Sequence, residues 1–193
     1  MAEMLDGGAN GIIAPYVETP EQVRKLSGAV KLRPVKGAVL EGTVSGASRL
    51  PGDTADYVAA RNAGNVLVIN IESTPALANL DAILSVPGVD AVQVGPHDLS
   101  CSLGIPEQYT HPLFLEKIEF IISTSRRHGV GVGIHFWNDM RQELEWGRMG
   151  ANLIMHSGDI TLLSQKLRED LRQFRESLRD PAPAEQTTSE TAV

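Results

Sequence analysis

The sequence predicts an α/β fold of the (β/α)8 TIM-barrel type. Short β-rich apolar runs alternate with longer amphipathic runs, which is the rhythm of strand–helix–strand units with right-handed crossovers. The short runs are almost continuously apolar, as is typical of strands buried on both faces of a parallel sheet. Polar residues follow four successive strands, and a barrel builds its active site at these carboxyl ends. The alternative, an open doubly wound sheet, would use only the crevice where its strand order reverses.

We expect one barrel domain over residues 1–180 and a disordered tail over residues 181–193, where no periodicity is visible. A hydrophobic content of 42% is enough for a folded core. Five strands are expected where a complete barrel has eight, so three strands are missing. The expected strands are residues 11–16, 66–71, 91–94, 132–136 and 153–156.

Two helices are predicted by the signals at their ends. Residues 112–128 begin with a proline and are followed by Gly129, a pairing typical of helix starts and stops. The last helix is expected to begin near Asp159 as its N-cap and to run to Leu178. Its apolar residues recur at spacings of three and four, and Arg and Glu crowd its other face. The last helix is therefore amphipathic.

Composition excludes several classes of protein. Lys and Arg number 17 against 24 Asp and Glu, and the net charge of −7 is spread along the chain. Nucleic acids and anionic membranes require a concentrated basic surface, so neither is an expected partner. The single cysteine, Cys101, excludes an intramolecular disulfide and fits a cytoplasmic location. No apolar run is long enough to span a membrane, and no secretory signal is visible.

Glu72 and Asp98 are the candidate metal ligands. Each follows an apolar strand, and a carboxylate there is costly unless it is paired, hydrogen-bonded or bound to a metal. Two acids at neighbouring strand ends can hold a hard divalent cation such as Mg²⁺ or Mn²⁺ from one side, with water and a chelating substrate completing the octahedron. Alternatively, Glu72 caps the helix after Pro75 or pairs with an arginine, and Asp98 caps a loop.

The loop after the third expected strand offers backbone groups to a ligand. Gly95 and Pro96 begin it, and a glycine at a strand end allows close approach of the backbone, although ordinary turn chemistry explains the same residues. Cys101 is expected to be a buried structural thiol, since no histidine–asparagine signature surrounds it.

Three of the five histidines are expected near the mouth of the barrel. His97, His135 and His156 lie at or next to strand ends, where a histidine can act as acid, base or ligand. For His135 and His156 a structural hydrogen-bonding role is the default. The other two histidines are expected at the ends of the helix over residues 112–128.

Three stretches of the sequence resemble the HpcH/HpaI aldolase/citrate lyase family: MLDGGANGIIAPYVETPEQV, VLVINIESTPALANLDAILSVPGVDAVQVGPHDLSCSLGIP and GANLIMHSGDITLL. The strand end I-E-[ST] and the loop G-P-x-D-L-S are specific as a pair. The resemblance implies a modified phosphoenolpyruvate/pyruvate-binding barrel that uses a divalent metal to stabilise a pyruvate enolate in class II aldol chemistry. It also implies dimers or hexamers that exchange the last helix.

The resemblance assigns roles to individual residues. Glu72 and Asp98 match the family's metal-ligating carboxylates, for Mg²⁺ or Mn²⁺, with Co²⁺ as a third candidate. Gly95 and Pro96 match the loop against the carboxylate of the bound keto acid. Asn70 stands where many members carry a Gln that touches pyruvate.

The resemblance finds only some of the family's catalytic groups in this sequence. Asp6 matches an acid that lies near the active site at a subunit boundary in relatives, and His97 replaces the small residue usual before the Asp. The family's base histidine and arginine belong to the first third of a typical barrel, which the resemblance places before Met1. If the chain acts alone, His97 or His135 is the expected base.

The sequence therefore predicts a metal-dependent carbon–carbon lyase that acts on a 2-keto acid such as pyruvate and an aldehyde. A catalytically impaired barrel fragment that binds metal, keto acid or a partner subunit is the alternative, and a citrate-lyase-β-like enzyme acting on an acyl-CoA ranks last, because no basic cluster suits the phosphates of CoA. Five strands leave two open edges, so we expect a homo-oligomer formed through the helix that begins near Asp159.

Overall fold

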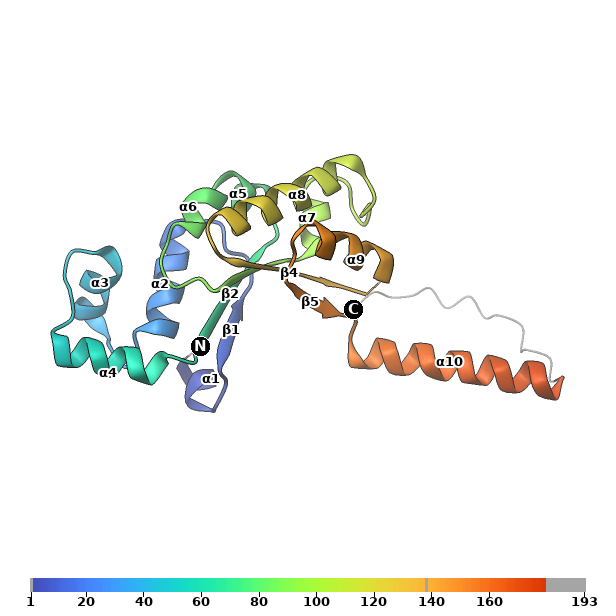
Figure 1. Cartoon of the computed structure of the whole chain (residues 1–193), viewed down its shortest axis with the longest axis horizontal. Helices are drawn as coiled ribbons and strands as arrows, with labels where there is room; N and C mark the ends of the chain where they lie inside the picture. The colour runs from blue at the N-terminus through green and yellow to red at the C-terminus, as the bar shows by residue number, and fades with distance from the viewer. Residues whose placement is uncertain (1, 138, 180–193) are drawn as a thin grey trace. The chain divides into compact units, whose positions relative to one another are not determined.

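The computed structural model describes residues 2–137 and 139–179. They form two compact units, with the division after His156. The first unit contains a five-stranded sheet, and the second contains helix α10 (Asp159–Leu178) (Figure 1). The tail expected over residues 181–193 lies outside the described residues.

All five predicted strands are present in one parallel sheet. They are arranged in chain order, and each neighbouring pair is parallel. Within the described residues the outermost strands each have one neighbour, so the sheet is open at both edges. The strands are β1 (Gly11–Ala14), β2 (Val66–Ile71), β3 (Ala91–Val94), β4 (Gly131–Phe136) and β5 (Leu153–His156).

The first strand ends two residues earlier than predicted. β1 stops at Ala14, because Pro15 has no N–H to donate to a ladder and Tyr16 has a left-handed φ of 53°. The chain therefore turns away from the sheet at the point where the candidate site begins.

Helices cover one face of the sheet. Helix α2 packs against β1 and β2, α8 against β3 and β4, and α9 against β5; Figure 1 shows α5, α6, α8 and α9 along one side of the strands. The helices of the first unit are α1 (Ala2–Asp6), α2 (Pro20–Lys31), α3 (Gly37–Ser45), α4 (Gly52–Asn62), α5 (Thr74–Ala78), α6 (Leu80–Leu84), α7 (Pro96–Ser102), α8 (Pro112–Arg127) and α9 (Met140–Met149).

The two faces of the sheet differ in chemistry. Leu67, Ile69 and Ile71 alternate along β2 toward the helices and are completely buried. Asn70 lies between the last two of these and therefore belongs to the other face, opposite Gln93 of β3. The amide side chains of Asn70 and Gln93 thus lie on the face of the sheet that faces away from the packed helices, as in the interior of a barrel.

The predicted helix over residues 112–128 corresponds to α8. His111 is its N-cap, and its Nδ1 accepts the N–H of Leu113 at 3.1 Å; His128 is the C-cap. Both histidines therefore lie at the helix ends, as expected.

Two smaller expectations are wrong. Asp159 is the first residue of α10 rather than its N-cap, because Gly158 has the extended backbone of the cap. Cys101 is exposed rather than buried, since α7 directs Pro96, Leu99 and Ser100 inward and the thiol falls on its outer side.

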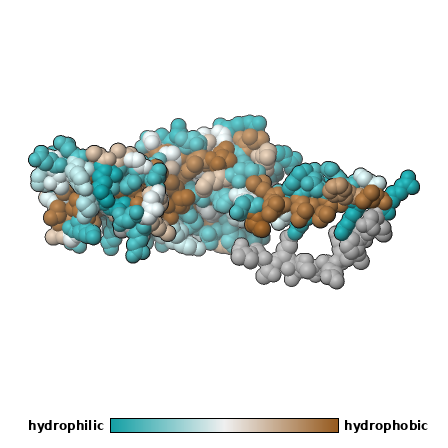
Figure 2. Space-filling view, turned by 90° about the horizontal axis from the view of Figure 1, so that it is seen from below, coloured by the Kyte–Doolittle hydropathy of each residue, from teal (hydrophilic) through white to brown (hydrophobic). Residues whose placement is uncertain are grey.

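Helix α10 carries an exposed apolar stripe. None of its described residues is buried, and Figure 2 shows hydrophobic side chains along its length. No helix in the described part of the chain combines the length and the apolar character needed to cross a membrane. The stripe consists of Ile160, Leu163, Leu167, Leu171, Phe174 and Leu178.

Candidate metal centre

Glu72 and Asp98 come from the carboxyl ends of neighbouring strands. Glu72 directly follows β2 and retains only 7% of its exposure. Asp98 lies in the first turn of α7, which begins immediately after β3, and it is half-buried. Because parallel strands end at the same edge of the sheet, the two acids are presented on one side of the molecule.

The carboxylate of Glu72 is held by two hydrogen bonds. Its Oε2 accepts the backbone N–H of Tyr16 at 3.0 Å, and its Oε1 accepts the side-chain amide of Asn70 at 2.8 Å. The N-cap of the following helix is Ser73, and no arginine in the described residues forms an ion pair with Glu72. Neither structural alternative for Glu72 therefore applies there.

Gly95 makes room for this carboxylate. A Cβ atom on Gly95 would lie 2.5 Å from Oε1 of Glu72 and 2.8 Å from its Cγ, closer than a real Cβ approaches another atom. The approach of a ligand expected at Gly95 stays a prediction; in the structure the group that lies close to this glycine is the Glu72 side chain. Any larger residue at position 95 would displace the acid.

Tyr16 joins the two acids and is a site residue that sequence reasoning missed. Its phenol hydroxyl donates to Oδ1 of Asp98 at 3.2 Å, while its backbone N–H binds Glu72. The hydrogen bond to Asp98, and after it the negative charges of Asp98 and Glu72 and some burial, raise the pKa of the Tyr16 phenol above its usual value. No sequence signal marks this residue, since its role depends on a left-handed φ after Pro15.

Two buried amide oxygens lie below Glu72 on the same face of the sheet. Asn70 and Gln93 are opposite each other in the register of β2 and β3. Asn70 Oδ1 and Gln93 Oε1 have no hydrogen-bond partner among the residues that the structure describes. Buried polar atoms normally have a hydrogen-bond partner, so these oxygens are available to accept a hydrogen bond from water or to contact a bound ligand. Gln93 was also not identified from the sequence.

Of the two histidines expected to act as the base, His135 lies on the face of the acids. Strand pairing places Gln93 of β3 opposite Gly133 of β4. Gly95 and His135 each follow two residues later, so they lie at the same level of the sheet. His135 is half-buried, and its ring contacts Trp137 edge-on at 5.3 Å between centroids.

His97 lies at the start of α7 and is more open. More than half of its side chain is exposed, and its Nδ1 lies 3.6 Å from Oε1 of Glu107, which is also exposed. His97 is a sequence neighbour of Asp98, but among the described residues no hydrogen bond or ion pair links its ring to either acid.

His156 and Asp6 are placed away from the two acids. His156 is opposite Phe136, on the side of the sheet that the helices cover, and its Nδ1 lies 2.6 Å from Oε2 of Glu143 in α9. Asp6 ends α1, before the amino end of β1, and forms an ion pair with Arg33. The structure therefore does not bring Asp6 together with Glu72 and Asp98 within this chain.

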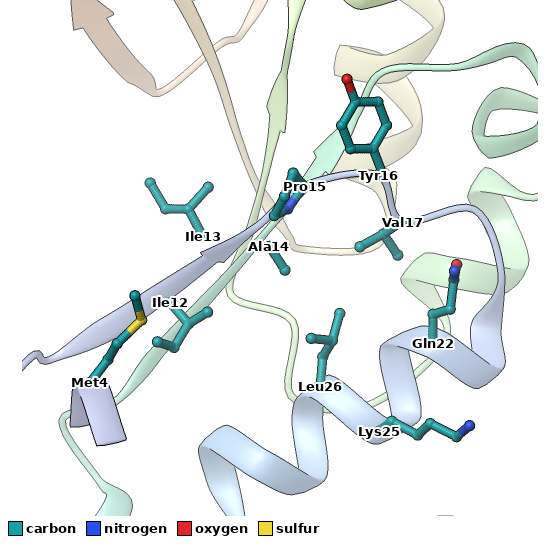
Figure 3. Close-up of a pocket in the computed structure, with 10 residues that line it drawn as sticks. All are labelled: Met4, Ile12, Ile13, Ala14, Pro15, Tyr16, Val17, Gln22, Lys25 and Leu26. Atoms are coloured by element: carbon teal, nitrogen blue, oxygen red, sulfur yellow. The ribbon is translucent and has the colours of Figure 1, made fainter. Parts of the chain in front are cut away.

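An apolar cavity of about 410 Å³ lies beside β1 and α2, next to the candidate centre (Figure 3). Ile12, Ala14 and Leu26 are among its lining residues, and Tyr16 stands beyond Pro15 with its hydroxyl directed away from α2. Neither Glu72 nor Asp98 lines this cavity, so it is separate from the pair of acids.

The donor set suits a hard divalent cation. Two carboxylates and two unpartnered amide oxygens are oxygen donors, the ligand type that Mg²⁺ and Mn²⁺ prefer. Within the described ranges, no three His, Cys, Asp or Glu side chains gather closely enough to hold a metal by themselves. A cation held by Glu72 and Asp98 would therefore complete its shell with water and substrate oxygens.

Comparison with known proteins gives a consistent result. Residues 1–165 match the family model described as HpcH/HpaI aldolase/citrate lyase. Over 181 residues the chain is 36% identical to the 2-keto-3-deoxy-L-rhamnonate aldolases of Klebsiella pneumoniae subsp. pneumoniae and Escherichia coli strain K12. Each alignment covers 93% of this chain and 66% of the relative, so the chain spans just under two thirds of the length of these curated relatives.

Solved structures confirm the predicted fold class. The HpcH/HpaI aldolase from Desulfitobacterium hafniense superimposes with a TM-score of 0.74 at 30% identity, covering 95% of this chain and 68% of that chain. An HpcH/HpaI aldolase/citrate lyase family protein from Burkholderia cenocepacia gives a TM-score of 0.75 at 26% identity, covering 90% and 68%. The five-stranded sheet is therefore part of a barrel of this type.

Proposed function

The chain belongs to the HpcH/HpaI aldolase/citrate lyase family, and from that premise we propose that it is a metal-dependent carbon–carbon lyase of the pyruvate-aldolase type. The observation that carries this proposal is the pair Glu72 and Asp98, presented by neighbouring strand ends and joined through Tyr16. The relatives named as 2-keto-3-deoxy-L-rhamnonate aldolases suggest a 2-keto-3-deoxy sugar acid as the first substrate to test.

In this proposal Glu72 and Asp98 hold Mg²⁺ or Mn²⁺, with Co²⁺ as a third candidate. When bound, the cation supplies Lewis-acid stabilisation of the negative charge that develops on the keto-acid fragment. The carboxylates are suited to this task because Glu72 is buried and already oriented by two hydrogen bonds.

The remaining residues bind the substrate and move a proton. The loop at Gly95 and Pro96 lies against the carboxylate of the keto acid, and Asn70 lies beside it. For cleavage, a base takes the proton of the substrate hydroxyl, the carbon–carbon bond breaks with its electron pair left on the keto-acid fragment, and an aldehyde is released. Return of a proton to the carbon of that fragment then gives the free keto acid. His135 is favoured as this base by its place at the level of Glu72, and His97 by its place next to Asp98.

Glu72→Gln and Asp98→Asn test the proposal directly. We expect the unaltered chain to bind Mn²⁺, to decarboxylate oxaloacetate and to cleave 2-keto-3-deoxy-L-rhamnonate. Each variant should lose at least about a hundredfold in Mn²⁺ affinity, because removing a ligand costs more than the 10–100-fold that removal of a supporting group costs. Calorimetry measures the affinity and pyruvate release measures the cleavage.

Glu116→Gln is the matched control, since Glu116 is an exposed acid on α8 paired with Lys117. Full Mn²⁺ affinity in either the Glu72 or the Asp98 variant would contradict the ligand assignment. In the same assays, a double variant His97→Ala/His135→Ala that keeps its activity would exclude both histidines as the base.

A second candidate is a barrel fragment that binds metal and keto acid without turnover. The sheet is open at both edges in the described residues, and this favours a requirement for further structure beyond these five strands. Metal binding without decarboxylation or cleavage would support this candidate, and clear turnover by the chain alone would exclude it.

We also infer a homo-oligomer formed through α10, because its apolar stripe is exposed. A cytoplasmic location is part of the same proposal, and the free Cys101 thiol supports it, since exposed thiols persist in a reducing compartment.

A further inference from the structure

We propose that Tyr16 is a positioning residue of the metal centre, which orients Glu72 through its backbone N–H and Asp98 through its phenol hydroxyl. This inference rests on the proposed function, because it takes the two acids to be metal ligands. It concerns a residue that no sequence pattern singled out. Groups that hydrogen-bond to metal ligands commonly fix the orientation of those ligands.

The contacts of Tyr16 reach both acids from one residue. Its N–H lies 3.0 Å from Oε2 of Glu72, and its hydroxyl lies 3.2 Å from Oδ1 of Asp98. The two acids come from different strands, separated by 25 residues of chain between them. A single residue that contacts both can therefore set the distance between the carboxylates, which neither acid can do by itself.

The backbone of Tyr16 is held in an unfavourable conformation. Its φ of 53° is uncommon for a bulky residue, and such a conformation persists only where the surroundings determine it. Pro15 fixes the chain on one side, and Val17, which is 2% exposed, anchors it on the other. The N–H of Tyr16 is thereby aimed at Glu72.

The ring itself is not part of the core. Tyr16 is 63% exposed, so its ring buries little apolar surface and contributes little to stability. The hydroxyl is the polar partner of the Asp98 carboxylate among the described residues. Loss of the hydroxyl should therefore change the orientation of Asp98 without unfolding the protein.

Tyr16→Phe removes the hydroxyl and keeps the ring and the N–H. We expect the Mn²⁺ affinity of the full chain to fall about tenfold, the lower end of the range for groups that orient metal ligands, because the contact is exposed. The thermal unfolding midpoint should remain unchanged. Mn²⁺ affinity is measured by calorimetry and by the electron paramagnetic resonance signal of free Mn²⁺, so no turnover is needed.

A spectroscopic signature separates this role from a merely structural one. Binding of Mg²⁺ to the unaltered chain should perturb the ultraviolet absorbance of tyrosine, because the phenol of Tyr16 contacts a ligand. Tyr16→Phe should abolish that difference spectrum. The control Tyr57→Phe removes the hydroxyl of another exposed tyrosine, on α4, and should leave both the spectrum and the affinity as they are.

A second variant, Tyr16→Asn, removes the phenol but keeps the backbone N–H directed at Glu72, because asparagine tolerates a left-handed φ. Its Mn²⁺ affinity should equal that of Tyr16→Phe. Unchanged or tighter Mn²⁺ binding in Tyr16→Phe would overturn the inference, as would loss of the folded state in both variants. If the unaltered chain binds no Mn²⁺, the metal site of the proposed function fails, and the role of Tyr16 fails with it.

Discussion

Gly95 shows how closely the backbone fits the side chains of the candidate centre. Glu72 leans over Gly95 with its Oε1 2.5 Å from where a Cβ would be. A carboxylate that is buried needs defined partners, and here Tyr16 and Asn70 provide them. The space at Gly95 therefore lets Glu72 accept both hydrogen bonds at once.

Gly95→Ala should disturb the centre without changing its chemistry. The added methyl group forces the Glu72 carboxylate away from its partners, and we expect Mn²⁺ affinity to fall at least about tenfold and the free energy of unfolding to fall by about 1–3 kcal/mol. Calorimetry and urea unfolding measure the two effects. Gly64→Ala is the control, because nothing lies within 4 Å of a Cβ there. Equal behaviour of the two variants would show that the close approach at Gly95 is unimportant.

The sequence pointed to only part of the candidate centre. Glu72 and Asp98 were singled out because an acid that follows an apolar strand is costly and therefore needs an explanation, and their role as metal ligands stays a prediction. Tyr16 and Gln93 were not predictable, since one depends on a left-handed turn after Pro15 and the other on strand register. Asp6 was placed by resemblance, and its ion pair with Arg33 lies at the other end of β1.

At the scale of elements, α6 and α8 are linked by charge as well as by packing. Asp81 of α6 lies 2.9 Å from Nε2 of His128 at the end of α8 and 3.5 Å from the guanidinium of Arg127. The hydrogen bond from His128, followed by the positive charge of Arg127, lowers the pKa of the Asp81 carboxyl. Positive groups at a helix C-terminus are also favoured by the helix dipole.

Asp81→Asn should therefore reduce stability in a pH-dependent way. A carboxyl whose pKa is lower in the folded state contributes stability above its unfolded pKa of about 3.9, and this contribution is lost as the pH falls through the lowered value. We expect a small loss of stability relative to the unaltered chain at pH 7 that disappears in strong acid, as measured by urea unfolding. Glu119→Gln, an exposed acid on α8, should show no such dependence. A loss of the same size at both pH values would mean that charge plays no part in the link.

The elements themselves were largely predictable. All five strands and the helices α8 and α10 were expected from apolar runs and from signals at their ends, such as the proline that begins α8. Their ends were less certain, because Tyr16 continues the apolar run of β1 although the ladder stops at Ala14. Local composition reports burial, whereas the end of β1 is set by the missing N–H of Pro15 and the left-handed φ of Tyr16.

Open sheet edges and an exposed apolar stripe are the features of the described residues that bear on assembly. Within the described residues β1 and β5 each lack a second neighbour, and the six side chains of the α10 stripe are exposed. The chain spans 66% of the length of its curated relatives, which agrees with five strands out of eight. The α10 stripe is the surface through which we propose that copies of the chain associate.

The α10 stripe gives the last prediction. Burying a side chain such as Leu or Phe contributes about 1.5–3 kcal/mol, so a second copy of the helix that covers the stripe would stabilise an oligomer substantially. Leu167→Glu/Leu171→Glu places two charges in the stripe, and we expect the molar mass measured by light scattering after gel filtration to fall to that of one chain. Gln165→Glu/Gln173→Glu adds the same charge on the polar face of the same helix and should leave the mass unchanged.

Dissociation in both double variants would mean that net charge, not the stripe, controls assembly. A single-chain mass for the unaltered protein would contradict the oligomer itself. Because α10 is 20 residues long and has no buried residue, its helical circular dichroism offers an independent check. Most of the stability of a helix in a protein comes from packing of its apolar face, so loss of the partner should also reduce the helical signal. A retained signal in the dissociated variant would show that α10 is stable without another copy.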